Sequence, residues 1–353
     1  MQEAKPNGAN NHYNTGEYAK LYLDRTLSSP YTINKSRLLA SVASKLGTLS
    51  VLDFGSNIHG SIKAEGSLRF QMSKKGINYA GVDLSLDYFD KNFFKTQGVP
   101  EEKIYPEING IVGDILKSPI KSNSAQMVIC CDVLEHVSDP IGALKEIYRI
   151  MQPEGVALVV LPSFYKLDMA DFSYIKNKRK SSHFKKKTTS WWMLACENNG
   201  LMIDESNSAP VGIASGLSYL VWMDERFVPE RQDLSSVETY SPQSSLHKKA
   251  KNIFSKYDEF IDIKIQSSGF SQTLLNALNQ GNIKKVFQIL NEIALKVVSD
   301  QNERQVLHKF FDEVAVVSYK PERVAVIKNI FMNSRFPHFL LGNSVLLVLK
   351  KKK

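Results

Sequence analysis

The stretch VLDFGSN at residues 51–57 decides the fold. It is a short apolar run around one aspartate, and it leads into Gly55, where the backbone can turn sharply and approach a ligand closely. Four more short apolar runs follow, and each is closed by glycine, aspartate or proline: residues 77–82, 108–112, 127–131 and 156–161. Apolar strands that alternate with helical stretches predict a parallel sheet covered on both faces. Ligands bind such sheets beyond the carboxyl ends of the strands, so the residues that close these runs form the candidate site.

The second half of the chain changes character. A helix at 188–199 and a short strand at 201–204 are followed by three stretches with apolar residues at helical spacing: 246–265, 274–298 and 306–317. We interpret their apolar stripes as core rather than as a partner surface, and strand character returns at 339–349. The pattern predicts an α/β fold: a Rossmann-like, doubly wound, mostly parallel seven-stranded sheet with a helical insertion before the last strand.

Four parts follow from this pattern. They are an N-terminal segment and helical cap at 1–46, the Rossmann-like core at 47–205, a helical insertion or substrate lid at 206–336, and the last strand with a basic tail at 337–353.

The chain is basic, with a formal net charge of +9. Part of the excess is a run of lysines and arginines at 176–187, which is either a solvated loop or a contact for an anionic substrate, a membrane surface or nucleic acid.

Apolar runs fall short of the roughly 20 residues that span a bilayer, and the polar N-terminus has no signal core. We therefore expect a cytoplasmic protein. The three cysteines (Cys130, Cys131 and Cys196) show neither a disulfide framework nor metal-ligand spacing.

Three more motifs lie at the ends of predicted strands. In GVDLS (81–85), Asp83 is placed to accept hydrogen bonds from both hydroxyls of a ribose. In GDI (113–115), Asp114 is placed to accept from an exocyclic amine, and CDVLEHV (131–137) follows the fourth strand and precedes Ser-Asp-Pro at 138–140. The first loop lacks the G-x-G-x-x-G spacing of a dinucleotide site, which disfavours a nicotinamide dehydrogenase.

Taken in order, the four motifs resemble the class I S-adenosylmethionine-dependent methyltransferase family, in its small-molecule branch with an LEHV motif. The resemblance covers about residues 48–205 and, weakly, the last strand. His-Phe at 183–184, Trp-Trp at 191–192 and Asn-Gly-Leu at 199–201 also resemble this family. The resemblance implies a transferase of biosynthetic metabolism that uses S-adenosyl-L-methionine as its cofactor.

The resemblance also implies roles for individual residues at the strand ends. The residues expected to bind the cofactor are Asp53, Gly55, Ser56 and Asn57 in the first loop, Asp83 with Leu84 at the ribose, Asp114 with Ile115 at the adenine, and Asp132 with Val133 at the methionine end. Within that set, Gly55 is expected under the methionine moiety and Asp53 is expected to support the loop.

Two departures from the family pattern affect the first loop. Asn57 stands where the family has a second glycine, and asparagine tolerates a left-handed backbone better than most residues. The chain from Asp53 to Asp83 is also longer than usual, with an apparent insertion at 58–66, so Gly60 is a candidate to replace part of the missing glycine's function.

Methyl transfer from a sulfonium is an in-line displacement, which the protein assists by alignment and by excluding water. If the acceptor is a hydroxyl, a general base helps, and His136 is the first candidate, with capping or packing of the next helix as its alternative. His183 is the second candidate. No His/Asp/Glu cluster accompanies Glu135, so we predict no metal. Tyr13, Tyr18 and Tyr22 either cover the site or pack against the core.

The expected partner is a small-molecule acceptor, and the basic run favours an anionic one such as a nucleotide-linked sugar or another phosphorylated metabolite. A methyltransferase acting on RNA or protein is an alternative, although no nucleic-acid module is recognisable. A non-catalytic interaction protein on the same fold is another, supported by Asn57 alone. The motifs leave the acceptor atom (O, N or C), the role of the insertion and the oligomeric state open.

Overall fold

The computed structural model describes residues 29–162, 189–213, 245–267, 270–315, 324, 341–342 and 344–352. Several sequence predictions fall outside these residues: those on Tyr13, Tyr18 and Tyr22, and those on the basic run 176–187, which includes His183.

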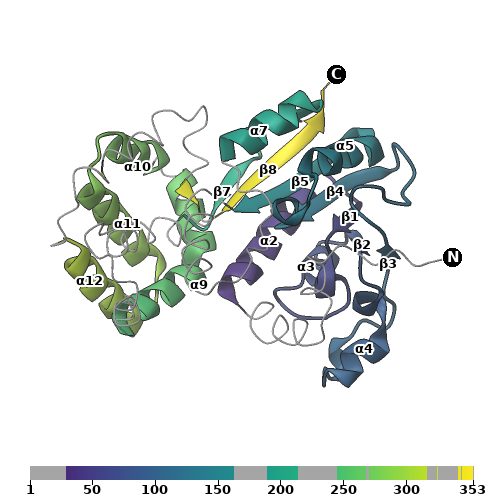
Figure 1. Ribbon diagram of the computed structural model, residues 1–353. Coiled ribbons are helices and arrows are strands. Elements are labelled where there is room, and N and C mark those ends of the chain that lie inside the picture. Colours follow the sequence, from purple (N-terminus) through teal and green to yellow (C-terminus); the bar gives the residue numbers. More distant parts are fainter. Residues whose placement is uncertain are drawn as a thin grey trace, which may run out of the picture.

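One mixed sheet of eight strands forms the centre of the fold (Figure 1). Its order is β3-β2-β1-β4-β5-β8-β6, with β7 paired to β8 beside this path. The first five strands run parallel, whereas β8 is antiparallel to β5, β6 and β7. The strands are β1 (Ser50–Phe54), β2 (Asn78–Asp83), β3 (Gly110–Val112), β4 (Ala125–Cys131), β5 (Met151–Pro162), β6 (Leu201–Ile203), β7 (Ala209–Val211) and β8 (Ser344–Lys351).

This architecture confirms the predicted Rossmann-like fold, with one strand more than the seven expected. The additional strand is β7, which lies inside the range predicted as the insertion and pairs with β8 through Ala209, Pro210 and Val211. Three residues are too few to show a periodicity of two, and Pro210 is a residue that usually disfavours a strand.

Helices cover both faces of the sheet. On one face, α2 (Pro30–Lys45) and α3 (Leu68–Ser73) share a core with Met127 and Ile129 of β4, and on the other, α5 (Pro140–Ile150) and α7 (Thr189–Asn198) enclose Val128 and Cys130. Alternate β4 residues therefore enter opposite cores, as expected for a strand buried on both faces. A short helix, α4 (Lys91–Thr96), and four 3-10 turns complete this half: η2 (Asn57–Gly60), η3 (Leu86–Phe89), η4 (Glu101–Lys103) and η5 (Leu134–His136).

Local sequence explains where two of these helices begin. The Ser29 side chain accepts a hydrogen bond from the Thr32 amide at the start of α2, and Asp139 accepts from the Gly142 amide at the start of α5. Pro140 occupies the first turn of α5, where its missing N–H removes no helical bond. The Ser-Asp-Pro sequence at 138–140 is thus a helix start placed just after the fourth motif.

Four helices form a second unit with its own hydrophobic core (Figure 1). They are α9 (Ser245–Ser267), α10 (Phe270–Asn279), α11 (Ile283–Val297) and α12 (Gln301–Ala315), and α9 packs against α2. The prediction that their apolar stripes are core is confirmed for Phe254, Leu290 and Phe310 among others. No helix in the described part of the chain is long and apolar enough to cross a membrane.

The stretch 274–298, which has apolar residues at helical spacing, is not one continuous helix, because the chain forms α10 and α11. Gly281 adopts a left-handed φ of +71°, which ends the first helix, and Asn282 accepts a hydrogen bond from the Lys285 amide, which starts the second.

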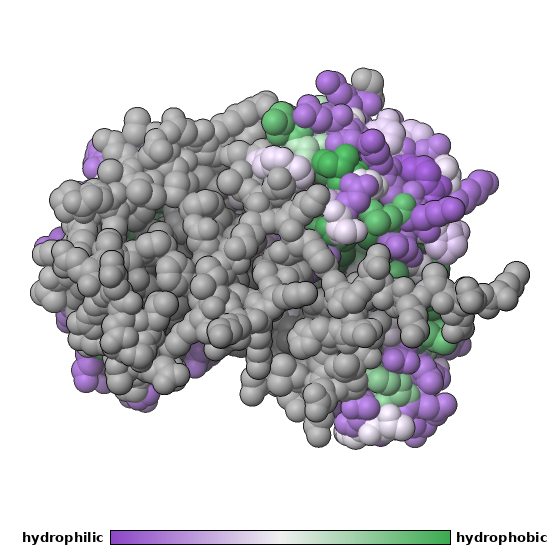
Figure 2. Space-filling view, in the orientation of Figure 1, coloured by the Kyte–Doolittle hydropathy of each residue, from purple (hydrophilic) through white to green (hydrophobic). Residues whose placement is uncertain are grey.

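The coloured part of the surface in Figure 2 is mainly hydrophilic, with hydrophobic residues scattered among the polar ones. Isolated exposed apolar residues such as Leu86 and Leu194 are normal for a folded chain and do not by themselves mark an interface.

Candidate functional site

The register of the parallel strands brings the four motifs to one edge of the sheet. Phe54 of β1 is level with Val82 of β2 and Cys130 of β4, and Asp83 is level with Val112 of β3. The residues that follow these positions therefore emerge side by side, as predicted from the sequence.

The first loop links three strand ends. The Gly55 amide donates to the Val82 carbonyl over 2.8 Å, and Gly55 has a φ of +69°. A Cβ atom at Gly55 would lie 2.4 Å from Cγ2 of Val133, the second residue after β4. Glycine is required here both by the backbone conformation and by the closeness of Val133.

Asn57 has a φ of +46°, which confirms that asparagine accommodates the left-handed turn. Its amide donates to Oδ2 of Asp83 over 2.9 Å, and the Ser85 amide donates to Oδ1 over 3.1 Å. Burial raises the pKa of Asp83, and these backbone hydrogen bonds oppose the rise. The aspartate expected at the ribose thus also holds the first loop in place, while Leu84 beside it is 52% exposed.

Asp53 is buried behind the loop and accepts a hydrogen bond from the Tyr79 hydroxyl, with 2.5 Å between Oδ2 and the phenol oxygen. Burial raises the pKa of Asp53 to about 7, an effect only partly offset by Tyr79. Asp53 precedes the loop on β1, and its support of the loop stays a prediction. Ser56 is fully buried next to it, against Gly81.

The inserted residues 58–66 form a compact support for the loop. Ile58 and Ile62 are buried in a small core of their own, and His59 Nδ1 accepts from the Leu68 amide over 3.2 Å. Burial lowers the pKa of His59 to about 4. A Cβ atom at Gly60 would lie 3.2 Å from the Tyr79 ring, so Gly60 serves the packing behind the loop.

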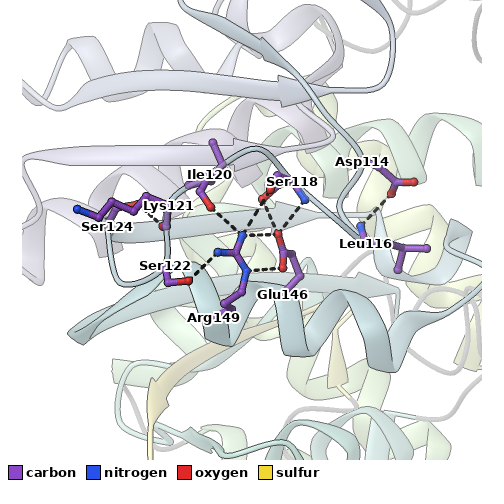
Figure 3. Close-up of polar contacts among 9 residues, drawn as sticks. All are labelled: Asp114, Leu116, Ser118, Ile120, Lys121, Ser122, Ser124, Glu146 and Arg149. Atoms are coloured by element: carbon purple, nitrogen blue, oxygen red, sulfur yellow. Dashed lines mark hydrogen bonds and ion pairs between the residues drawn. The ribbon is translucent and has the colours of Figure 1, made fainter.

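A polar network fixes the connection that follows the third motif (Figure 3). Asp114 is exposed and accepts from the Leu116 amide over 2.8 Å, whereas Ile115 is buried in the core under α5. Further along this connection, the amide and hydroxyl of Ser118 both donate to Oε1 of Glu146, at 2.8 and 2.6 Å.

Arg149 completes this network. Its guanidinium donates to both oxygens of Glu146 and also to the carbonyl of Ile120 and the hydroxyl of Ser122. The segment that follows Asp114 is therefore fixed to α5 by charge-assisted hydrogen bonds.

At the end of β4, Asp132 has a left-handed φ of +53°, and its carboxylate forms an ion pair with Lys35 of α2. In the next turn, Leu134 and Glu135 are buried, and the His136 side chain is 25% exposed with Nε2 3.9 Å from Glu135 Oε1. The N-cap of α5 is Asp139 rather than His136. No group of three histidine, cysteine or acidic residues in the described ranges could hold a metal ion.

Sequence reasoning missed Lys35, Tyr79 and His59, which contact or surround the predicted residues. They lie in the second turn of α2, at the start of β2 and in the insertion, where the sequence pattern indicates only packing. No local motif could have indicated them, because their roles depend on the tertiary arrangement.

Comparison with known proteins supports this reading of the domain. Residues 63–159 match the family model described as "Methyltransferase domain", a range that begins after β1 and the Gly55 loop. "Putative methyltransferase YqeM" from Bacillus subtilis (strain 168) is 27% identical over 109 residues, which are 29% of this chain and 40% of that protein. The chain therefore spans less than half the length of this curated relative.

Solved structures described as methyltransferases also resemble the chain. A "putative sarcosine dimethylglycine methyltransferase" from Galdieria sulphuraria has a TM-score of 0.41 at 13% identity, covering 90% of this chain and 85% of the other. A SAM-dependent methyltransferase from Aquifex aeolicus has a TM-score of 0.37 at 15% identity, covering 56% and 92%.

Residues 63–159 thus match a methyltransferase domain, and they lie in a sheet whose first five strands have the Rossmann-like order β3-β2-β1-β4-β5. The cofactor of this type of domain is S-adenosyl-L-methionine.

The residues at the strand ends fit this cofactor. Each carboxylate oxygen of Asp83 accepts one backbone N–H and retains a second acceptor position, which suits the two hydroxyls of a ribose.

Proposed function

We propose that this protein transfers the methyl group of S-adenosyl-L-methionine to a small, anionic acceptor. The observation that carries the proposal is the arrangement of Asp83, which presents acceptor positions at the end of β2 while it fixes the left-handed turn at Asn57. The same carboxylate thus shapes the loop and faces the ligand position.

The choice of acceptor rests on charge and on the position of the helical unit. The net charge of +9 favours an anionic molecule. The helical unit α9–α12 packs against α2, and Lys35 of α2 forms an ion pair with Asp132 at the strand ends. This position supports a role for the helical unit in lining the acceptor site.

The bound cofactor supplies an electrophilic methyl group. In the proposed mechanism Asp83 orients the ribose, Gly55 allows the backbone to approach the ligand, and the segment after Asp114 covers the adenine. Methyl transfer at this site would be an in-line displacement, in which the acceptor's nucleophile would replace sulfur at the methyl carbon. For a hydroxyl acceptor, His136 takes the proton, a role that the partial exposure of its imidazole supports.

Calorimetric titration with S-adenosylmethionine and S-adenosylhomocysteine tests the proposal. We expect micromolar binding that falls at least tenfold in Asp83→Ala and persists in Asp87→Ala, an exposed aspartate on the adjoining turn. Thermal melting of both variants checks that the fold is retained.

Absence of binding by the folded wild-type protein would overturn the proposal. Methylation of RNA or protein substrates, with none of a panel of phosphorylated sugars, would overturn the choice of acceptor while leaving the cofactor in place.

A further inference from the structure

Lys35 is buried to an unusual degree for a cation. It is the only lysine or arginine among the buried residues of the described chain. Buried ammonium groups are rare because removing the charge from water is unfavourable unless a paired carboxylate offsets the loss of hydration. Two contacts stabilise the charge of Lys35. They are an ion pair with Asp132 and a cation–π contact with the ring of Tyr31, whose centroid is 5.3 Å from Nζ.

Docking of α2 on the sheet does not explain the ion pair. Leu39, Ala40 and Ala43 of the same helix are almost fully buried in the core that they share with β1, β4 and β5. Apolar residues in place of a buried ion pair usually stabilise a fold as well or better, so packing alone gives no reason for these charges.

The position of the pair points to a ligand. Asp132 follows directly after β4, at the edge where Gly55 and Asp83 also lie, and its amide is bonded to the carbonyl of Val160 over 3.0 Å. Its side chain is 26% exposed, compared with 11% for Lys35. A ligand at the strand ends can therefore reach a carboxylate and an ammonium that are already side by side.

We propose that Lys35 and Asp132 together select the amino-acid end of the cofactor. This inference rests on the cofactor of the proposed function. The amino-acid end is a zwitterion, with a carboxylate and an ammonium on one carbon. Lys35 binds the ligand carboxylate and Asp132 binds the ligand ammonium, so that two opposite charges on the protein meet two opposite charges on the ligand.

The ion pair also explains how the two charges are stabilised before a ligand binds. Without ligand, Lys35 and Asp132 neutralise each other, so neither charge is left buried and unpaired. Because the two groups are already placed, little ordering is required when the zwitterion binds. A ligand that lacks the carboxylate leaves Lys35 without this second partner, and it is expected to bind more weakly.

The test compares two ligands that share adenine, ribose and sulfur. S-adenosylhomocysteine carries the amino-acid end, and 5′-methylthioadenosine lacks it. We expect Lys35→Met to weaken S-adenosylhomocysteine at least tenfold and to leave 5′-methylthioadenosine within about twofold, the change expected for loss of one charge-assisted contact. Lys45→Met, at the far end of the same helix and exposed, should change neither affinity.

A structural role for Lys35 predicts a different result, because displacement of α2 would weaken both ligands equally. Equal weakening, or no weakening of S-adenosylhomocysteine, would overturn the inference. If Lys35→Met does not fold, the variant Lys35→Met with Asp132→Asn removes both charges and should abolish the preference between the two ligands.

Failure of this inference can be told apart from failure of the proposed function. If wild type binds S-adenosylhomocysteine and Asp83→Ala does not, while Lys35→Met keeps the preference, only the inference is wrong. If wild type binds neither ligand, the proposed function itself is wrong.

Discussion

The hydroxyl of Tyr79 donates a hydrogen bond to the buried carboxyl group of Asp53 on the neighbouring strand. Val51, rather than Asp53, is level with Tyr79 in the β1–β2 register, so the long phenol reaches two residues along β1. Asp53 and Tyr79 therefore join the first two strands directly behind the candidate site, in surroundings where the aspartate pKa is about 7.

Asp53 and His59 give opposite pH dependences of stability. The folded pKa of Asp53 is raised from 3.8 to about 7, so its contribution to the free energy of unfolding is lost as pH rises through this window. The folded pKa of His59 is lowered from 6.5 to about 4, so its contribution is lost as pH falls through that window. Between pH 4 and 6.5 the two slopes oppose each other, each at most about 1.4 kcal/mol per pH unit.

We therefore expect Asp53→Asn to make the free energy of unfolding rise with pH over this range, and His59→Asn to make it fall. Asparagine keeps an acceptor for Tyr79 in the first case and for the Leu68 amide in the second. Urea denaturation at several pH values measures both slopes. Slopes indistinguishable from wild type in both variants would contradict the assigned pKa shifts.

Two separate features require glycine at position 55: the left-handed backbone and the close contact with Val133. Gly55→Ala should destabilise the protein by more than the roughly 1–2 kcal/mol that a left-handed backbone costs alanine, because its Cβ would meet Val133 at 2.4 Å. Gly47→Ala is the matched control, since Gly47 has a φ of +70° with nothing within 4 Å of its Cβ position.

Adding Val133→Ala to Gly55→Ala should restore the part of the stability that is lost because the new Cβ atom clashes with the Val133 side chain. Chemical denaturation and cofactor titration measure both effects. Equal losses in Gly47→Ala and Gly55→Ala would show that the contact with Val133 is unimportant.

His136→Gln should lower the rate of methyl transfer without changing cofactor binding. With a hydroxyl acceptor, we expect kcat to fall by about 10²–10⁴, the typical contribution of a general base, while the affinity for S-adenosylhomocysteine is unchanged. A variant that keeps wild-type kcat would exclude this histidine as the base.

The network of Glu146 and Arg149 should control order in the segment after Asp114. Arg149→Met removes the donors to Ile120 and Ser122. We expect faster hydrogen exchange at the Ser118 amide and binding of S-adenosylhomocysteine weakened roughly three- to tenfold, in line with about 1 kcal/mol for a lost hydrogen bond. Lys145→Met, on an exposed position of the same helix, is the control. Unchanged exchange would mean that the segment is ordered by other contacts.

Patterns within the sequence predicted the features that depend on local chemistry. The apolar runs located β1–β5, and the tolerance of asparagine for left-handed backbone predicted Asn57 correctly, at a φ of +46°. The strand ends predicted that Asp83 and Asp132 lie at one edge, because parallel strands share a direction. Glycine followed by asparagine at 281–282 is typical of a helix end and a new helix start, but the helical periodicity continues on both sides, so the break was not predicted.

Features that depend on side chains meeting across the fold could not be predicted in this way. Lys35 lies 97 residues from Asp132, and Tyr79 lies 26 residues from Asp53. Strand β7 exists because β8 offers it a free edge, and its three residues carry no pattern of their own.

The placement of β8 in the sheet sets an order of assembly. In the described residues, β6 and β7 are hydrogen-bonded to the sheet only through β8, and β8 reaches β5 across a separation of nearly 200 residues. During synthesis the five parallel strands can pair as they emerge, whereas β6 and β7 must wait for residues 344–351. Until then β5 has an open, apolar edge, which is the kind of edge on which chains aggregate. The nascent chain is therefore most vulnerable while the helical unit is being made, and a truncation before residue 344 would keep it in that state.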